Sequence, residues 1–487
     1  MGHYTVRLIE PRTRPGRPFN AWINRWPLLG PIILASILEE RGYDVAVYNE
    51  NISGSLLENG EALEEICSAD VVGISIMTPT ASRGYAIADH VRQRRPAPRI
   101  VFGGVHATFC PQEALSHGDI VVRGEGESVI EEIACGTIRQ GIVEGAPVAS
   151  LDSIPTLNHF LMRDFQKLFG RFRPRELYQL PVMASRGCPY GCKYCTVTRM
   201  FGRRVRRQSV EKVHYDICRY AEQGFRHFFF YDDNFTTDRK WTKRLLARLA
   251  PMRLRFNAQV RADFHWLDRA RRHRDEDLLR GMRAAGGDVL YIGYETIDET
   301  TAKQWHKGYG GHGSLKSRLM EDSRVLHENG FWIHGMFVLG PQHTRRTADQ
   351  IVAFARRSEL ETLQISILTP FPGTPLMEQM RPHLVLDDFP ADWDYYDGTH
   401  CVYNHSRLGI EGFQRTVLDA HRRFYGWGGW SLRRLRAVTG QRIPIVEKLS
   451  QLWSNAATAR TTLRSWKAET RAFIETVKAR ATRFEIS

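Results

Sequence analysis

Three cysteines lie within the segment SRGCPYGCKYC, residues 185–195, at Cys188, Cys192 and Cys195. Thiolates are soft ligands that suit zinc or an iron–sulfur cluster. A [4Fe–4S] cluster usually takes four thiolates, so three from one loop leave one iron open to a small chelating ligand. Gly187 and Gly191 permit tight backbone turns around the cysteines. The spacing therefore predicts an iron–sulfur site with one iron free for chemistry.

Two other interpretations of the cysteine loop need different surroundings. A structural zinc site takes four ligands, and the nearest further cysteine is Cys218, 23 positions after Cys195. A purely structural cluster is the second alternative. The remaining cysteines are too scattered for the disulfide framework of a small secreted domain. They are Cys67, Cys110, Cys135, Cys218 and Cys401.

The composition is that of a globular protein with more than one core. The chain has 487 residues, of which 42% are hydrophobic and 25% charged. It has no run of eighteen apolar residues and no signal-peptide core at its start, so we expect a cytoplasmic protein. The net charge of +14 raises nucleic acid or anionic lipid as partners. Residues 431–487 hold twelve Lys or Arg against four Asp or Glu, a net of +8, which disfavours nucleic acid.

Residues 1–140 are predicted to form an α/β domain. Apolar strand patterns alternate with helical patterns, which is typical of a doubly wound parallel sheet of the Rossmann type. The strands are expected at 5–10, 43–49, 71–77, 99–104 and 119–127, and the helices at 27–42, 61–70 and 82–95. Such sheets bind ligands at the carboxyl ends of their strands. Here those ends are residues 75–80, 103–106 and 124–126.

A second β–α series is predicted after a connector at 141–178. Residues 179–385 contain six strand patterns separated by helices, which indicates a partial (βα)6 barrel of the TIM type. The strands are expected at 176–187, 227–235, 255–264, 287–296, 332–340 and 362–375, and the helices at 210–223, 238–250, 275–285, 314–328 and 346–359. The catalytic site of such a barrel lies at the carboxyl ends of its strands. Residues 386–487 form an aromatic-rich, helical and basic C-terminal region.

The cysteine loop, following a strand that starts a β–α series, resembles that of the radical S-adenosylmethionine (SAM) superfamily. The resemblance implies that Cys188, Cys192 and Cys195 hold a [4Fe–4S] cluster whose open iron is chelated by SAM. The implied SAM contacts are Tyr194 near the adenine, Asp232 or Asp233 of YDDNF at the ammonium, Gln259 and Arg261 ending the third barrel strand, Glu295 of IGYET at the ribose hydroxyls, and Pro370 of LTPFPGTPL beneath the adenine.

Simpler explanations exist for several of these side chains. Asp232 and Asp233 could cap the following helix, and Arg261 could neutralise an internal carboxylate. No catalytic acid, base or radical-relay residue is assigned.

A doubly wound domain ahead of such a barrel resembles the cobalamin (B12)-dependent radical SAM class, and the resemblance covers roughly residues 5–430. The implied cobalamin contacts are Ser75, Thr78, Gly103, Gly104, His106, Gly124 and Glu125. The loop after the first strand, residues 10–26, lacks the DxHxxG histidine that ligates cobalt in many relatives. We therefore expect base-off cobalamin. His106 is the one tempting substitute ligand, although a hydrogen-bonded turn residue is the simpler interpretation, and loss of cobalamin is a further alternative.

The resemblance implies a C-methyltransferase that acts on an unactivated carbon of a lipid or secondary metabolite. A cyclase, ring-contraction or other carbon-skeleton enzyme with the same cofactors is the alternative. A tRNA-modifying enzyme is less favoured because the chain lacks additional clustered cysteines in its N-terminal half. A non-enzymatic basic protein with a structural cluster is a fourth interpretation. The enzymatic interpretations need a small-molecule substrate and an electron donor such as flavodoxin or ferredoxin.

The C-terminal region offers apolar surface for either a pocket or a core. Its aromatic side chains are Trp393, Tyr395, Tyr396 and Trp427. Residues 445–482 then place apolar side chains near helical spacing, with basic residues on the other side. These are Leu449, Leu452, Trp453, Ala456, Leu463, Trp466, Phe473 and Val477. Such a helix could lie peripherally on an anionic membrane or pack on its own protein, and packing is the commoner case.

Overall fold

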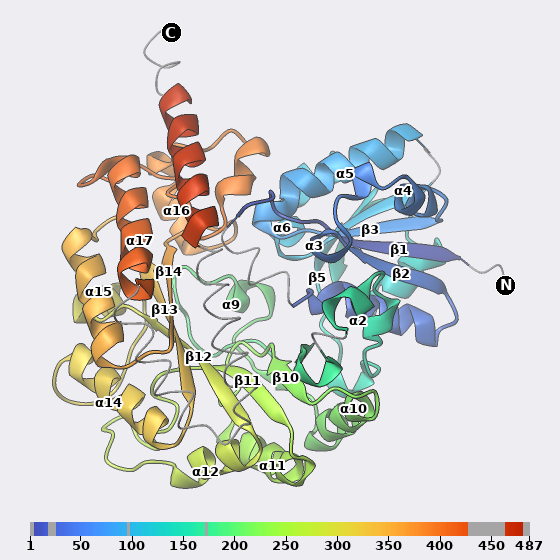
Figure 1. The fold of residues 1–487 in the computed structure, drawn as a ribbon. Helices are drawn as coiled ribbons and strands as arrows, with labels where there is room; N and C mark the ends of the chain where they lie inside the picture. The colour runs from blue at the N-terminus through green and yellow to red at the C-terminus, as the bar shows by residue number, and fades with distance from the viewer. Residues whose placement is uncertain (1–3, 18–25, 95–97, 171–173, 427–462, 481–487) are drawn as a thin grey trace.

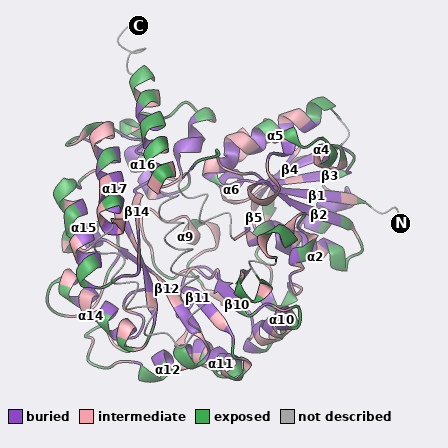
Figure 2. Cartoon of the chain, viewed as in Figure 1, coloured by how far each residue is buried: buried purple, intermediate pink, exposed green. Residues whose placement is uncertain are grey.

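The computed structural model describes residues 4–17, 26–94, 98–170, 174–426 and 463–480. Two parallel sheets face one another across the centre of the molecule, and each is covered by helices (Figure 1). Most residues of their strands are buried, and exposed residues gather on the outer helices (Figure 2). The predicted α/β class, with a Rossmann-like sheet, a barrel-like sheet and a helical C-terminal region, is confirmed.

The N-terminal sheet is six-stranded, in the order β2-β1-β3-β4-β5-β6. The chain builds outward from β1 in both directions, so the switch point lies between β1 and β3. The strands are β1 (Thr5–Glu10), β2 (Asp44–Asn49), β3 (Val71–Ser75), β4 (Arg99–Gly103), β5 (Ile120–Gly124) and β6 (Gly141–Gly145). The accompanying helices are α2 (Leu29–Glu40), α3 (Glu50–Ser53), α4 (Gly60–Cys67), α5 (Ala81–Arg94), α6 (Val105–Phe109), α7 (Pro111–Leu115) and α8 (Ile130–Ala134).

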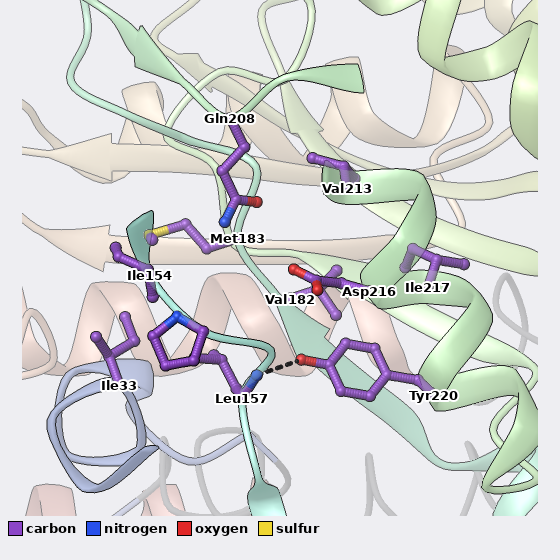
Figure 3. A pocket seen from close by; sticks show the side chains of 11 residues that line it. Ile33, Ile154, Leu157, Val182, Met183, Gln208, Val213, Asp216, Ile217 and Tyr220 are labelled. Atoms are coloured by element: carbon purple, nitrogen blue, oxygen red, sulfur yellow. Dashed lines mark hydrogen bonds between the residues drawn. The ribbon is translucent and has the colours of Figure 1, made fainter. Parts of the chain in front are cut away.

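The predicted connector, residues 141–178, contributes a strand and packed side chains in its described part. Its first residues form β6, which pairs with β5, so the sheet continues past residue 140. Further on, Leu157 lies between Ile33 of α2 and Tyr220 of α10 (Val210–Glu222) around a cavity of about 20 Å³ (Figure 3). The Leu157 amide donates to the Tyr220 hydroxyl at 3.0 Å. The cavity has room for about one water molecule, so it marks a packing junction and not a ligand site. The segment has too little sequence periodicity to predict this packing.

The second sheet is also six-stranded and parallel, with its strands in chain order. They are β7 (Gln179–Val182), β10 (His227–Phe230), β11 (Arg255–Val260), β12 (Gly287–Glu295), β13 (Trp332–Leu339) and β14 (Thr362–Ile367). The helices are α10 (Val210–Glu222), α11 (Arg239–Leu249), α12 (Glu276–Ala284), α13 (Glu299–Gln304), α14 (Leu315–Glu328), α15 (Arg345–Arg357), α16 (Pro375–Met380) and α17 (Gly409–Tyr425). The sheet curves as a partial barrel, with helices along its outer side (Figure 1).

The C-terminal helix, residues 463–480, packs on its own protein. Trp466, Phe473 and Ile474 are buried, and the Phe473 ring lies 4.8 Å from that of His400. At its end, Arg480 donates two hydrogen bonds of 2.6 Å to Asp392. Of the two interpretations of this helix, the structure thus supports packing over membrane contact. Leu449, Leu452, Trp453, Ala456 and Trp427 lie outside the described residues.

The predicted C-terminal aromatic side chains are part of the core. Trp393, Tyr395 and Tyr396 are all buried. The Tyr396 hydroxyl donates to the Leu386 carbonyl at 2.6 Å, and the Trp393 indole donates to Glu113 at 3.0 Å. These contacts favour packing over a substrate pocket. Within the described residues, no helix is both long and apolar enough to span a membrane.

Replacing Phe473 with alanine tests the docking of the C-terminal helix. We expect Phe473→Ala to lower the free energy of unfolding by about 3 kcal/mol, because it removes a buried aromatic ring. Chemical denaturation measures the change. Arg471→Ala, on the exposed side of the same helix, is the matched control and should stay within about 0.5 kcal/mol of the wild type. Equal stability of the two variants would contradict the packing described.

Candidate cofactor site

The three cysteines lie on the loop between β8 (Ser185–Arg186) and β9 (Arg206–Arg207), which pair as a short antiparallel ribbon. The loop follows β7, the first barrel strand, and includes the short helix α9 (Val197–Met200) after its last cysteine. Gly187 has a φ of +92°, and a Cβ there would lie 2.8 Å from the Arg204 carbonyl oxygen. The loop therefore turns back on itself directly before Cys188, at a position that only glycine accepts easily.

Burial favours the neutral form of two of the three loop thiols. All three cysteines are partly exposed and unpaired by disulfides. Burial raises the pKa of the Cys188 thiol, and raises that of Cys195 to about 12, because a thiolate there is poorly solvated. Bound iron ions would stabilise the thiolates, which gives a donor set that fits a cluster. Among the described residues, no group of three or more His, Cys, Asp or Glu side chains is arranged around a single metal ion.

Asp232 and Asp233, directly after β10, support the cysteine loop. Asp232 is buried, and its Oδ1 accepts hydrogen bonds from the Ala184 and Ser185 amides at 2.9 and 2.6 Å. Asp233 accepts one from the Gly187 amide at 3.3 Å. Burial raises the pKa of Asp232 to about 7 and that of Asp233 to about 6. Neither caps the next helix, whose N-cap is Asp238, so the capping interpretation is wrong.

Glu295 is the last residue of β12 and lies beside Lys307, a buried cation that the sequence did not predict as a site residue. Its φ is +62°, a strained value for a glutamate, and its Oε1 lies 3.1 Å from Lys307 Nζ. Lys307 is only 8% exposed, and its charge acts on the Cys188 thiol, where it favours the thiolate. A buried ammonium beside the cysteine loop can offset negative charge on a cluster or on a bound carboxylate. No motif marks Lys307, since it follows α13 and lies outside any strand end.

The other predicted SAM contacts occupy different surroundings. Arg261 pairs with Asp263 at 3.0 Å, as the neutralising interpretation expects, and its guanidinium lies 4.0 Å from the Tyr190 ring of the cysteine loop. It lines a polar cavity of about 590 Å³. Tyr194 meets the ring of Trp305 edge-on at 5.7 Å. Pro370 is buried just after β14, and Gln259 accepts from the Phe235 amide through its backbone carbonyl.

A largely apolar cavity of about 350 Å³ lies where the two sheets meet. On one side it is lined by the ends of β1, β3, β4 and β5, including the predicted Ser75, Gly103, Gly104, Gly124 and Glu125. On the other side lie Met183, Ser185, Arg186, Tyr231 and Asp233, at the base of the cysteine loop. A Cβ on Gly103 would meet nothing within 4 Å, which leaves open space at this strand end. The cavity thus joins the predicted cobalamin face to the predicted cluster loop.

His106 and Thr78 do not line this cavity. The His106 side chain is fully buried, with Nδ1 3.4 Å from the Thr78 hydroxyl and Nε2 3.0 Å from a Glu113 carboxylate oxygen. Both ring nitrogens therefore have protein partners. The simpler interpretation of His106, a hydrogen-bonded structural histidine, is the one that the geometry supports.

Glu10, at the carboxyl end of β1, is a buried carboxyl group at the switch point. Its Oε2 accepts hydrogen bonds from the Leu28 amide at 3.0 Å and from the Asn49 amide group at 2.8 Å. Burial raises its pKa to about 8, although the Leu28 hydrogen bond acts in the opposite direction. A neutral Glu10 at pH 7 keeps charge away from the apolar cavity that Leu28 lines.

Comparison with known proteins gives two matching family models. Residues 24–134 match the B12 binding domain, and residues 182–355 match the Radical SAM superfamily. The chain is 26% identical over 426 residues to bacteriochlorophyllide d C-12(1)-methyltransferase of Chlorobaculum tepidum, covering 86% of each chain. It is 24% identical to the anaerobic magnesium-protoporphyrin IX monomethyl ester cyclase of Cereibacter sphaeroides, covering 84% of this chain and 70% of the cyclase.

A solved structure shares the overall fold. The radical SAM methyltransferase TsrM from Kitasatospora setae, determined with cobalamin and a [4Fe–4S] cluster, aligns with a TM-score of 0.65 at 15% identity. The alignment covers 97% of this chain and 100% of that one.

Removing any one cysteine of the loop should abolish cluster binding. We expect Cys188→Ala, Cys192→Ala and Cys195→Ala each to lose most of the iron that the reconstituted wild type retains, since two thiolates hold a cluster poorly. Iron analysis and the visible absorption spectrum measure the loss. Cys218→Ala, on α10, is the control and should retain full iron. Iron retained by all three loop variants would contradict the assignment.

Glu10 should make stability depend on pH. Its folded pKa of about 8 lies above the ordinary value of 4.5, so the folded state holds a proton that the unfolded state releases between these values. The free energy of unfolding should therefore fall as pH rises from 5 to 8, by about 1 kcal/mol per pH unit from this group. Glu10→Gln should remove this part of the slope, as measured by urea denaturation across that range. An unchanged slope would contradict a protonated Glu10.

Proposed function

Because the chain belongs to the cobalamin-dependent radical SAM enzymes, we propose that it is a C-methyltransferase acting on an unactivated carbon of a lipid or secondary metabolite. When bound, the cluster and SAM supply a 5′-deoxyadenosyl radical, and cobalamin supplies a transferable methyl group. The observation that carries the proposal is the apolar cavity between the two sheets. It opens both to the strand ends of the B12-binding domain and to the base of the cysteine loop.

The chain's own residues have distinct tasks in this proposal. Cys188, Cys192 and Cys195 hold the cluster, and Asp232 fixes the backbone that leads into their loop. Lys307 and Glu295 form a buried ion pair beside the loop, suited to orient the charged groups of SAM. Tyr194, Asp233, Gln259, Arg261 and Pro370 remain proposed SAM contacts, and Ser75, Gly103, Gly104 and Gly124 remain proposed cobalamin contacts.

The apolar walls protect a reactive intermediate. Leu8, Ile74, Val101 and Met183 line the cavity and present few hydrogen-bonding groups, so bound water is disfavoured there. Exclusion of water and of stray hydrogen donors is what a carbon-centred radical needs. We propose base-off cobalamin, since the described part of the loop after β1 contains no histidine. The cluster also needs an electron donor such as a cytoplasmic flavodoxin or ferredoxin.

A ring-forming or rearranging reaction is the second candidate. The similarity to the magnesium-protoporphyrin cyclase favours it, because that protein covers most of this chain at nearly the same identity as the methyltransferase. The two reactions differ in what becomes of the SAM methyl group.

Labelled SAM distinguishes these reactions even while the substrate is unidentified. The reconstituted, reduced enzyme is incubated with SAM carrying a CD3 group and with a metabolite extract from cells lacking the enzyme. We expect S-adenosylhomocysteine and 5′-deoxyadenosine to form together, with one metabolite gaining the CD3 group, as mass spectrometry measures. The Cys188→Ala variant is the control and should form no 5′-deoxyadenosine. A new product without label or S-adenosylhomocysteine would contradict methyl transfer and favour the cyclase-type reaction.

A further inference from the structure

Four charged side chains form a buried network where the two sheets meet. Arg186 Nη1 donates to Glu125 Oε2 at 2.5 Å, and its Nη2 donates to Glu127. Arg206 donates to the same Glu125 oxygen at 3.1 Å and also to the other oxygen of that carboxylate. The side chains of Arg186, Glu125 and Glu127 are only 6%, 2% and 6% exposed. Two cations and two anions thus neutralise one another, three of them almost out of contact with water and Arg206 with an 18% exposed side chain.

The two arginines stand at the ends of the cysteine loop. Arg186 and Arg206 are register partners on the β8–β9 ribbon, so their like charges lie directly opposite one another. Such a pair is unfavourable unless carboxylates lie between the guanidinium groups. Residues 187–205, which include all three loop cysteines, connect these two strands. Whatever holds Arg186 and Arg206 therefore holds both ends of the loop.

The two carboxylates belong to a rigid turn of the other sheet. Glu125 and Glu127 follow β5, and the Glu125 amide donates to the Gly145 carbonyl of β6 at 3.3 Å. A Cβ on Gly145 would lie 2.1 Å from the Glu125 carbonyl oxygen, so the two backbones are in close contact. Glu125, Glu127 and Arg186 all line the cavity between the sheets. The network therefore connects a fixed edge of that cavity to the cysteine loop.

Glu125 was expected to contact cobalamin, and the structure gives it another role. Both of its carboxylate oxygens are engaged by arginines. A buried ion pair adds little net stability compared with apolar side chains of similar size, because desolvation of the charges offsets their attraction. Directional, two-pronged arginine–carboxylate contacts do fix orientation. Fixing the orientation of the cysteine loop therefore explains these four charges better than a gain in stability does.

We propose that Glu125, Glu127, Arg186 and Arg206 are positioning residues that fix the cysteine loop against the strand ends of the B12-binding domain. The inference rests on the proposed function, in which the SAM and cobalamin sites open into one cavity. The four side chains act through the loop and touch no reacting atom. Their removal should change how the loop is held relative to the N-terminal sheet.

Hydrogen exchange of the reconstituted holoenzyme tests whether the network holds the loop. Glu125→Gln keeps the size of the side chain but leaves two facing guanidinium groups without their shared anion. We expect amides of residues 185–187 and 205–207 to exchange about tenfold faster, while those of β1 and β13 stay unchanged. Unchanged exchange around the loop would overturn the proposal. An equal increase throughout both sheets would also overturn it, because that result indicates general destabilisation.

A matched control and a milder variant accompany the exchange experiment. Glu144→Gln removes another Glu–Arg contact in the neighbouring strand, with Arg123 at 2.5 Å, but its carboxylate side chain is 71% exposed. This variant should match the wild type around the loop. Glu127→Gln removes the negative charge that pairs with Arg186 alone and should accelerate exchange at 185–187 only. If Glu125→Gln does not fold, the Glu127→Gln variant alone tests whether the network holds the loop.

Electron paramagnetic resonance provides a spectroscopic measurement that distinguishes a positioning role from a purely structural one. When the holoenzyme is poised so that the cluster is [4Fe–4S]+ and the cobalamin is cob(II)alamin, both cofactors carry an unpaired electron, and their magnetic interaction depends on the separation and orientation of the two sites. Glu125→Gln and Glu127→Gln should alter this interaction, and Glu144→Gln should not. Spectra identical to the wild type in both loop variants would overturn the positioning role. A wild type without cobalt would contradict the proposed function, and hydrogen exchange would still decide the role of the network.

Discussion

The cysteine loop lies at the junction of two separate sheets, and both sheets have to hold it there. From the barrel side, the Asp232 carboxylate accepts the Ala184 and Ser185 amides and so fixes the backbone that leads into the loop. From the N-terminal side, Glu125 engages Arg186 only two residues before Cys188. Buried carboxylates from both sheets thus hold the start of the loop, since Asp232 accepts from its backbone and Glu125 and Glu127 pair with Arg186.

This constraint explains several features that otherwise look unrelated. Gly187 has a positive φ because the chain must turn sharply between Arg186 and Cys188. The connector is packed between α2 and α10, which fixes the two sheets relative to one another. The C-terminal helix joins the same assembly, since Glu469 pairs with Arg17 of the N-terminal region at 3.0 Å. Rigid placement of the two proposed cofactor sites requires contacts on several sides of the cavity.

Much of the fold could be predicted from the sequence because the signals are local. Continuous apolar strands and amphipathic helices predicted both sheets, and the cysteine spacing predicted the loop. The missed features depend on contacts between distant segments. From the sequence alone, Glu125 looks like a ligand-binding residue at a strand end. The structure shows that Arg186 and Arg206 lie beside it. Lys307 lies in a loop without a motif, and only the fold brings it to Glu295. Similarly, β6 is short and rich in glycine, so the sequence did not predict its pairing with β5.

We propose that one chain holds a cluster and a cobalamin on opposite walls of the cavity between its sheets. Metal analysis of protein purified without oxygen, from cells supplied with cobalamin, is the decisive measurement. We expect about one cobalt per chain together with the iron of one [4Fe–4S] cluster, and a visible spectrum with bands from both cofactors. Protein that retains its iron but binds no cobalt, even after incubation with cobalamin, would contradict this proposal.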